Sequence, residues 1–205
     1  MRQIYKVNIN DKEINFACNE YVVKNNDTTL TLSNPSENNI QKIISDFILN
    51  ESYKKLFLIT IEPKSLFKAF RKDYKIVNAA GGLVKDKDNR ILFIFRRGKW
   101  DLPKGKIEKD ERKQHAALRE VREETGLDTL MIVRRLDKTY HIYTEKNIHI
   151  LKKTYWYEMV AIKAAPLHPQ IEEDITDIRW FEPDNLNEVL SNTYPLVAEL
   201  VKGIL

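Results

Sequence analysis

Three glutamates crowded into one turn of a predicted helix constrain this chain more than any other feature. The segment 105–127 reads GKIEKDERKQHAALREVREETGL, and Glu120, Glu123 and Glu124 stand within five positions of it. On a helix, the spacing i, i+3, i+4 brings the three carboxylates together on one face. Such like charges repel, whereas a hard divalent cation such as Mg²⁺ would take them as oxygen ligands. The alternative is a solvated acidic face that forms ion pairs with Arg112, Lys113, Arg119 and Arg122.

The same segment indicates where this helix begins and ends. Asp110 is the predicted N-cap, and Glu111 would lie in the first turn, where the helix dipole favours negative charge. Gly126 is the predicted C-terminal stop. At about 100° per residue, one apolar side of the helix is formed by Ala117, Leu118 and Val121.

The segment also follows a fixed pattern, G-x5-E-x7-R-E-U-x-E-E-x-G-U, in which U is an aliphatic residue. A chance match at one start position is on the order of one in a billion from ordinary residue frequencies. The pattern resembles the complete signature of the Nudix (MutT-like) hydrolase family. The resemblance extends over roughly residues 73–205 and includes the two strands before the segment, the stretch WDLPKG and the strand end RWFEP. The constrained positions are Gly105, Glu111, Arg119, Glu120, Val121, Glu123, Glu124, Gly126 and Leu127.

The resemblance implies an α/β fold, in which a mixed sheet lies between helices as an α/β/α sandwich. It also implies hydrolysis of a phosphoanhydride bond in a nucleoside diphosphate derivative, with Mg²⁺ as cofactor and Mn²⁺ as a substitute. By position, Glu120, Glu123 and Glu124 would bind the metal, together with the backbone carbonyl of Lys104.

Further residues complete the catalytic group that the resemblance implies. Arg119 would orient Glu111 and the metal-binding glutamates through ion pairs. A general base is still needed for the attacking water, and in this family it is a glutamate of the signature or a carboxylate on a later loop. The segment PQIEEDI supplies such carboxylates, and we expect Glu173 or Glu172 to be a metal ligand or the base. The alternative is a solvated loop without a catalytic role.

The substrate must be inferred from residues outside the signature. The stretch WDLPKGKIE resembles hydrolases of dinucleoside polyphosphates and their relatives that act on oxidised nucleoside triphosphates. Those hydrolases carry a tyrosine shortly beyond the signature, where Tyr143 stands with Tyr140 nearby. ADP-ribose and inositol pyrophosphates are alternative substrates, the latter because KKTYWYEM resembles a strand of inositol pyrophosphate hydrolases. Basic side chains that could pair with a polyphosphate are Arg96, Lys104, Lys106, Lys152 and Lys153.

Residues 1–73 lie outside the resemblance and are predicted to form a small α+β domain before a Nudix domain at 74–205. A structural or oligomerisation role is favoured for the first domain, and substrate capping is the alternative. In the second domain, Trp156 and Tyr157 are expected to point to opposite faces of a strand. Expected strands lie at 4–9, 13–18, 27–32, 55–61, 75–84, 90–97, 131–143, 151–162 and 175–183, and expected helices at 36–50, 65–74 and, with Pro195 as a break or kink, 186–205.

Composition restricts the class of protein and its location. The chain of 205 residues has a net charge of +4, which alone is too small to indicate nucleic-acid binding. Its single cysteine, Cys18, excludes an intrachain disulfide, so a reducing cytoplasm is expected. No apolar stretch is long enough to span a membrane, and the N-terminus lacks a secretory pattern. We therefore expect a small nucleotide or polyphosphate partner rather than a nucleic acid or membrane, with a homodimer left open.

Two other functions share parts of this pattern. A ligand sensor would keep the fold without catalysis, but the intact glutamates argue against it. An mRNA-decapping or RNA-processing pyrophosphohydrolase would share the chemistry, but it would need a more extended basic surface than a net charge of +4 guarantees.

Overall fold

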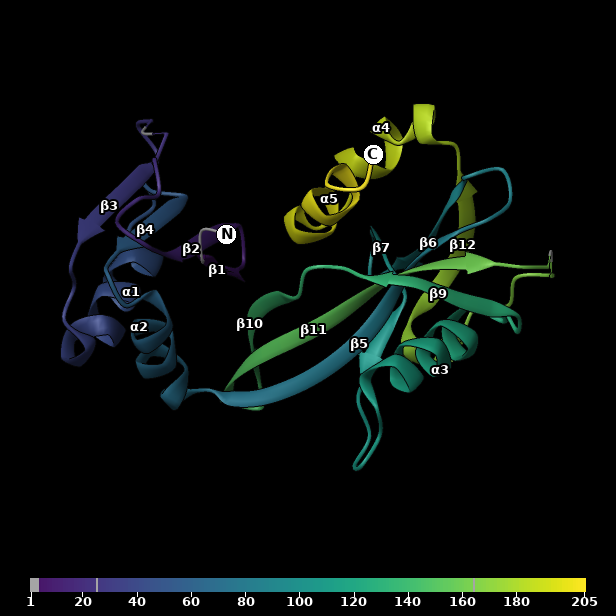
Figure 1. Cartoon of the computed structure of the whole chain (residues 1–205), viewed down its shortest axis with the longest axis horizontal. Helices are drawn as coiled ribbons and strands as arrows, with labels where there is room; N and C mark the ends of the chain where they lie inside the picture. Colours follow the sequence, from purple (N-terminus) through teal and green to yellow (C-terminus); the bar gives the residue numbers. More distant parts are fainter. Residues whose placement is uncertain (1–3, 25, 164) are drawn as a thin grey trace. The chain divides into compact units, whose positions relative to one another are not determined.

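The computed structural model describes residues 4–24, 26–163 and 165–205, and the chain divides into two compact units. Unit 1 contains residues 1–77 and 140–152, and unit 2 contains residues 78–139 and 153–205. Figure 1 labels most helices and strands of both units. Three strands have residues in both units: β5 (Lys75–Lys85), β10 (Thr139–Glu145) and β11 (Ile148–Ala161).

Unit 1 is a mixed sheet with two helices. Besides β10 and β11, its strands are β1 (Ile4–Ile9), β2 (Lys12–Ala17), β3 (Thr29–Ser33) and β4 (Lys55–Ile59). In the order β10-β1-β2-β4-β3, β1 runs parallel to β10 and antiparallel to β2, while β4 runs parallel to both of its neighbours. The helical elements are η1 (Glu37–Asn39), α1 (Ile40–Leu49), α2 (Pro63–Phe70) and η2 (Arg71–Asp73), where η denotes a 3₁₀ turn.

The core of unit 1 follows from side-chain periodicity. In β2 and β4, alternate residues enter one apolar cluster, as a pleated strand requires. In α1, the buried positions Ile40, Ile44 and Phe47 recur at helical spacing. Pro63 begins α2, where its missing N–H and fixed φ suit a helix start. The cluster consists of Val7, Ile14, Phe16, Ile40, Ile44, Phe47, Leu56, Leu58, Leu66, Phe67, Phe70, Tyr140, Ile142 and Leu151.

The hairpin of β10 and the start of β11 belongs with unit 1, whereas the sequence predicted residues 140–152 as part of the second domain. Residues 7–9 of β1 pair in parallel with residues 140–142 of β10. The ring of Tyr140 also packs edge-on against Phe67, with the ring centroids 4.9 Å apart. Pairing between strands far apart in the sequence sets this boundary, and no local pattern shows it.

Unit 2 is an α/β/α sandwich, which confirms the fold class expected from the resemblance. Helix α3 (Lys113–Thr125) covers one face of its sheet, while α4 (Asn187–Ser191) and α5 (Pro195–Lys202) cover the other (Figure 1). The strand order is β12-β6-β5-β11, with β7 on β6, β8 on β5 and β9 on β11. The remaining elements are β6 (Ile91–Arg96), β7 (Lys99–Asp101), β8 (Lys104–Lys106), β9 (Leu130–Arg135), η3 (Ile171–Glu173), β12 (Ile175–Phe181) and η4 (Pro183–Asn185).

Two apolar clusters fill the spaces between this sheet and its helical layers. Within β6, Leu92 and Ile94 pack in the cluster of α3, whereas Phe93 between them packs in the cluster of α4 and α5. The same alternation places Tyr157 in the first cluster and Trp156 in the second, which confirms that they point to opposite faces. The central strands are therefore buried on both sides.

One strand that the sequence predicted as continuous is divided in the structure, and one predicted helix is divided where a break or kink was expected. The segment 131–143, expected as one strand, forms most of β9 and the start of β10. Both strands pair with β11, and β10 also pairs with β1. The helix expected over 186–205 is interrupted, because Pro195 lacks an N–H for the preceding turn and instead begins α5. None of the helices in the described ranges is long and apolar enough to cross a membrane.

Glu158 is a buried charge on β11 that two basic residues neutralise. Its carboxylate accepts hydrogen bonds from Lys85 Nζ at 2.9 Å and from Arg134 Nε at 2.6 Å. Burial raises the pKa of Glu158, but these two partners outweigh burial and bring the pKa below its ordinary value. Because the folded pKa is lowered, the stabilisation is present above the unfolded pKa and is lost as the pH falls through the folded pKa.

We expect Glu158→Gln to lower the free energy of unfolding at neutral pH by about 1–3 kcal/mol, because Lys85 loses its charged partner. The difference from the wild type should shrink below the ordinary glutamate pKa of 4.5, as the wild-type carboxylate becomes protonated. Urea unfolding at neutral and acidic pH measures both values, with the exposed Glu188→Gln as control. If the free energies of unfolding of wild type and Glu158→Gln differed equally at the two pH values, the stabilising role of the charged Glu158 would be contradicted.

Candidate active site

Gly126 closes the last turn of α3, the helix that carries the glutamates. It has a left-handed conformation with φ of 78°, which glycine adopts without a Cβ clash, and its N–H donates to the carbonyl of Arg122 at 2.8 Å. The predicted C-terminal stop is therefore confirmed. The predicted N-cap is wrong, because Asp110 lies in the preceding turn with φ of 64° and Arg112 occupies the cap position.

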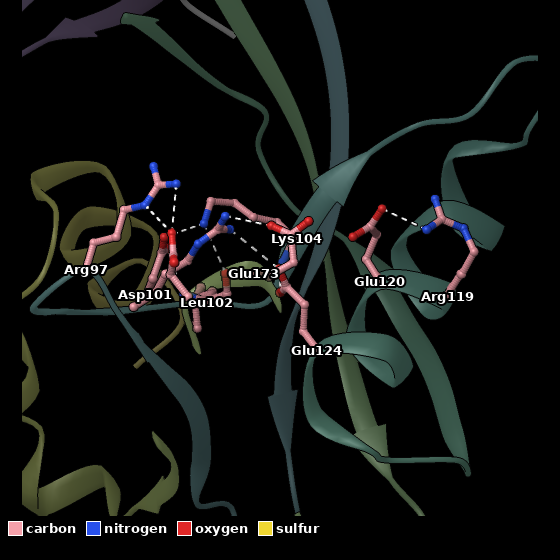
Figure 2. Close-up of polar contacts among 10 residues, drawn as sticks. Arg97, Asp101, Leu102, Lys104, Arg119, Glu120, Glu124 and Glu173 are labelled. Carbon is pink, nitrogen blue, oxygen red and sulfur yellow. Dashed lines mark hydrogen bonds and ion pairs between the residues drawn. The ribbon is translucent and has the colours of Figure 1, made fainter. Parts of the chain in front are cut away.

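Arg119 lies at the centre of the acidic cluster and binds three carboxylates. It donates two hydrogen bonds of 2.9 Å to Glu111, and its Nη1 donates to Glu120 and to Glu123 at 2.8 Å each. Figure 2 shows the contact between Arg119 and Glu120. The bidentate contact lowers the pKa of Glu111, which lies before α3 and not in its first turn as predicted. Arg119 thus fixes where these carboxylates lie.

Burial destabilises the charged forms of two glutamates on α3. Glu124 is 1 % exposed, and burial raises its pKa to about 7. Its Oε2 accepts a hydrogen bond from the backbone N–H of Lys104 at 2.7 Å. Burial also raises the pKa of Glu120, and the negative charges of Glu123 and Glu173 add to this effect. A cation bound among these carboxylates would offset both burial and repulsion.

Two glycines allow the close packing of this region. A Cβ at Gly105 would lie 1.8 Å from Oε2 of Glu120, far inside van der Waals contact. A Cβ at Gly81 on β5 would lie 2.3 Å from the carbonyl oxygen of Pro103, next to β8. The glycine at 81 thus allows a close backbone approach within the strand, and Gly105 provides the space in which the carboxylate of Glu120 lies.

Arg96, at the end of β6, connects the glutamates of α3 to the loop before β12. Its Nη2 lies 2.7 Å from Oε2 of Glu173, and its Nη1 lies 3.7 Å from Oε1 of Glu124. Its Nε is buried and has no hydrogen-bond partner in the described part of the chain. Glu172 is exposed beside Glu173 in η3. Of the two predicted candidates for the base, the structure brings Glu173 to the glutamate cluster.

The side chain of Lys104, predicted to bind phosphate, is paired with Asp101 (Figure 2). Its Nζ contacts the Asp101 carboxylate and donates to the carbonyl of Leu102 at 3.3 Å. Asp101 is 5 % exposed and was missed in the sequence, although the i, i+3 spacing in WDLPK is a signal for this pair. Lys106 is exposed, and its carbonyl accepts a hydrogen bond from Arg119 at 3.0 Å. Phosphate binding by Lys106 stays a prediction.

The two tyrosines predicted to bind substrate belong to unit 1, whereas the glutamates belong to unit 2. Tyr140 is 5 % exposed and lies in the apolar core of unit 1, so packing accounts for it. Tyr143 is half-buried, and its ring stacks on His141 with centroids 6.0 Å apart. A substrate contact of Tyr143 stays a prediction, and Tyr140 is a core residue.

The donor set on α3 fits a hard divalent cation, although it is not arranged around one. No group of three or more histidine, cysteine, aspartate or glutamate side chains among residues 4–24, 26–163 and 165–205 is placed to hold a metal ion. Arg119 binds one oxygen of Glu120 and one oxygen of Glu123. Carboxylate oxygens are nevertheless the ligands that Mg²⁺ and Mn²⁺ prefer, and Gly105 leaves room for Oε2 of Glu120.

The sheet of unit 2, its two helical layers and the helix α3 with its glutamates together define a known class of protein. The NUDIX domain matches residues 75–201, more than half of the chain. The chain belongs to the Nudix hydrolase family.

Two relatives and one solved structure show the range of similar proteins. The chain is 26 % identical over 135 residues to mRNA-decapping enzyme subunit 2 from Arabidopsis thaliana, covering 62 % of this chain but only 35 % of that protein. It is 35 % identical over 83 residues to the 8-oxo-dGTP diphosphatase from Proteus vulgaris, covering 37 % of this chain and 72 % of that protein. A binary complex of the Caenorhabditis elegans Ap4A hydrolase has the same fold at 19 % identity and a TM-score of 0.50, covering 62 % of this chain and 94 % of that chain.

We expect Gly105→Ala to weaken Mn²⁺ binding by about 10- to 100-fold, because the added Cβ would displace the carboxylate of Glu120. Isothermal titration calorimetry measures the affinity, and circular dichroism verifies that the variant is folded. Gly203→Ala is the matched control, since a Cβ there meets its nearest atom at 3.5 Å. Unchanged Mn²⁺ affinity in Gly105→Ala would show that the position of Glu120 is irrelevant to the metal.

Proposed function

We propose that this protein is a Mg²⁺-dependent hydrolase that cleaves a phosphoanhydride bond in a nucleoside triphosphate or a dinucleoside polyphosphate. The observation that carries the proposal is the partly buried carboxylate cluster of α3. Glu120 lies against Gly105, Glu124 binds the backbone N–H of Lys104, and burial raises the pKa of both glutamates. An acidic cluster that is unfavourable by itself and lies in an intact family signature supports a metal-assisted reaction on a polyphosphate.

The three glutamates would hold the metal through the oxygens that Arg119 leaves available. Arg119 binds Oε1 of Glu120 and Oε2 of Glu123, which leaves Oε2 of Glu120 and Oε1 of Glu123. The backbone carbonyl of Lys104 is a further candidate ligand, since its N–H already binds Glu124. Bound Mg²⁺ would neutralise charge on the diphosphate and make a coordinated water more acidic.

Glu173 is the proposed base that accepts a proton from the attacking water. Arg96 is the positioning residue, because it contacts Glu173 at 2.7 Å and Glu124 at 3.7 Å and so ties the base to the metal-binding helix. Arg119 and Glu111 act in the same way on Glu120 and Glu123. The chain mainly positions groups and neutralises charge, as phosphoryl transfer requires.

Among the candidate substrates, a nucleoside triphosphate, oxidised or not, is the best supported. The relative with 35 % identity is an 8-oxo-dGTP diphosphatase, and the chain covers 72 % of its length. The Ap4A hydrolase supports the fold alone at 19 % identity. The tyrosine expected for dinucleoside polyphosphates, Tyr143, lies in unit 1. Support for a dinucleoside polyphosphate substrate therefore comes from the sequence resemblance alone.

A second candidate substrate is the 5′ end of an RNA. The relative with 26 % identity over 135 residues is an mRNA-decapping enzyme subunit. The 5′-terminal anhydride of RNA and that of a nucleoside triphosphate are chemically alike, so the same glutamates would serve either substrate. Binding of the remaining RNA would have to come from other surfaces of the chain.

We expect Mg²⁺-dependent turnover of 8-oxo and ordinary nucleoside triphosphates, and a loss of roughly 100-fold or more in Glu123→Gln, because a metal supplies several kcal/mol. The assay is a substrate panel with product identification by mass spectrometry. The panel also contains diadenosine tetraphosphate, ADP-ribose, an inositol pyrophosphate and 5′-triphosphorylated RNA. Absence of turnover across the panel would favour a ligand sensor, and full activity of Glu123→Gln would refute the metal site.

For the base, we expect Glu173→Gln to lower kcat by about 100- to 10,000-fold with little change in KM. Glu172→Gln is the matched control, because Glu172 is the exposed neighbour of Glu173 and makes no contact with Arg96. Steady-state kinetics on the best substrate of the panel measures both variants. Equal activity of the two variants would remove Glu173 from the mechanism.

A further inference from the structure

Three basic side chains lie over the ring of Tyr155 beside the first turn of α3, and a fourth interacts with it electrostatically. We call these five residues the Tyr155 cluster. Lys113 Nζ lies 4.3 Å and Lys153 Nζ 4.7 Å from the centroid of the Tyr155 ring, and the guanidinium carbon of Arg135 lies 5.9 Å from it. Lys138 is the fourth basic residue and interacts electrostatically with Lys153, Arg135 and Tyr155. The cluster comes from α3, β9, β11 and the loop after β9, all within unit 2.

No carboxylate of the described residues forms an ion pair with this cluster. The ion pairs within 4.0 Å in the described ranges include Arg134, the neighbour of Arg135, but none of the four cations of the cluster. Asp137 partly offsets the repulsion on Lys138 without pairing to it. Other basic residues of unit 2 near the glutamates, such as Arg96 and Arg119, bind carboxylates. The Tyr155 cluster is thus a concentration of uncompensated positive charge.

The crowding has measurable electrostatic consequences. Partial loss of solvation lowers the pKa of Lys138, and the positive charges of Lys153 and Arg135 lower it further. Burial raises the pKa of Tyr155, but Lys153 and Lys113 outweigh burial and lower it. Both shifts indicate a positive potential that a bound anion would relieve. In the ordinary alternative, lysine stems simply pack on a tyrosine ring. That packing does not explain why four cations gather without a carboxylate partner among the described residues.

The cluster is separate from the glutamate site. Lys113 is the first residue of α3, seven residues before Glu120, which corresponds to about 10 Å along the helix axis. Tyr155 is 6 % exposed and anchors the cluster in the apolar core under α3, whereas Lys113, Arg135 and Lys138 are exposed. The backbone N–H groups of the first turn of α3 add partial positive charge at this place.

We propose that the Tyr155 cluster is a second anion site, which binds a terminal phosphate or diphosphate group of a small phosphorylated molecule. Three cations at one ring, with Lys138 interacting electrostatically, suit a compact group of two or more negative charges. A nucleic-acid backbone carries one charge per phosphodiester and would spread its contacts along a groove. Lysine ammonium groups bind phosphate as point charges, and the guanidinium of Arg135 can form a bidentate contact.

The test uses the full chain in EDTA, so that binding does not depend on metal or on turnover. Inorganic tripolyphosphate is titrated calorimetrically into wild type, the double variant Lys113→Gln/Lys153→Gln, and Lys87→Gln as an exposed control of unit 2. We expect the double variant to bind about tenfold more weakly or worse and Lys87→Gln to bind like the wild type. Glu123→Gln should also bind like the wild type, so failure of the hydrolase assignment would leave this result unchanged.

Two outcomes would overturn the second site. One is a wild-type chain that does not bind tripolyphosphate in EDTA, and the other is a double variant that binds as tightly as Lys87→Gln. Competition identifies the ligand class: ATP should displace tripolyphosphate, and an oligoribonucleotide without terminal phosphates should not. Equal competition by the oligoribonucleotide would show that the cluster recognises phosphodiesters and would contradict the proposed ligand. Tyr155→Phe keeps the ring and should retain at least part of the binding.

Discussion

Two arginines hold the carboxylates of unit 2 together, and the arrangement of the candidate active site depends on this balance of charge. Arg119 binds Glu111, Glu120 and Glu123, while Arg96 contacts Glu173 and Glu124. Without these contacts, the repulsion between the glutamates within one turn would destabilise α3. With them, the carboxylates stay close together while Glu124 remains buried. The arginines stabilise an arrangement that a divalent cation could then use.

Close packing around α3 positions these charges. Glycine at 105 leaves space for the carboxylate of Glu120, and glycine at 81 lets the backbone next to β8 approach β5. On the other side of the helix, Ala116, Ala117 and Val121 lie in the apolar cluster of the sheet. The helix is therefore fixed by small apolar residues along one side and by ion pairs along the other. A larger residue on either side would move the glutamates, which explains why packing and chemistry are coupled here.

The sequence predicted contacts set by spacing within α3 better than pairings between distant segments of the chain. The contact of Arg119 with Glu123 is set by the i, i+4 spacing within one helix, so the signature alone predicts it. The packing of Tyr140 against Phe67 depends on pairing between β10 and β1, which are more than a hundred residues apart. The i, i+3 spacing of Asp101 and Lys104 could have predicted their ion pair. It was missed because a lysine beside the signature was expected to bind phosphate. The choice of Glu173 over Glu172 needed the position of Arg96, which comes from another strand.

The charges on α3 oppose its own dipole at both ends. A helix dipole favours negative charge in the first turn and positive charge in the last turn, by about 0.3–1 kcal/mol for each group. In α3 the first turn holds no acidic residue and begins with Lys113 after Arg112, whereas the last turn holds Glu123 and Glu124 next to a single arginine. A cation bound near the last turn and an anion bound near the first would each reverse this penalty. The reversed polarity of one helix thus links the glutamate cluster and the Tyr155 cluster, since a ligand of opposite charge would offset the dipole penalty at either end.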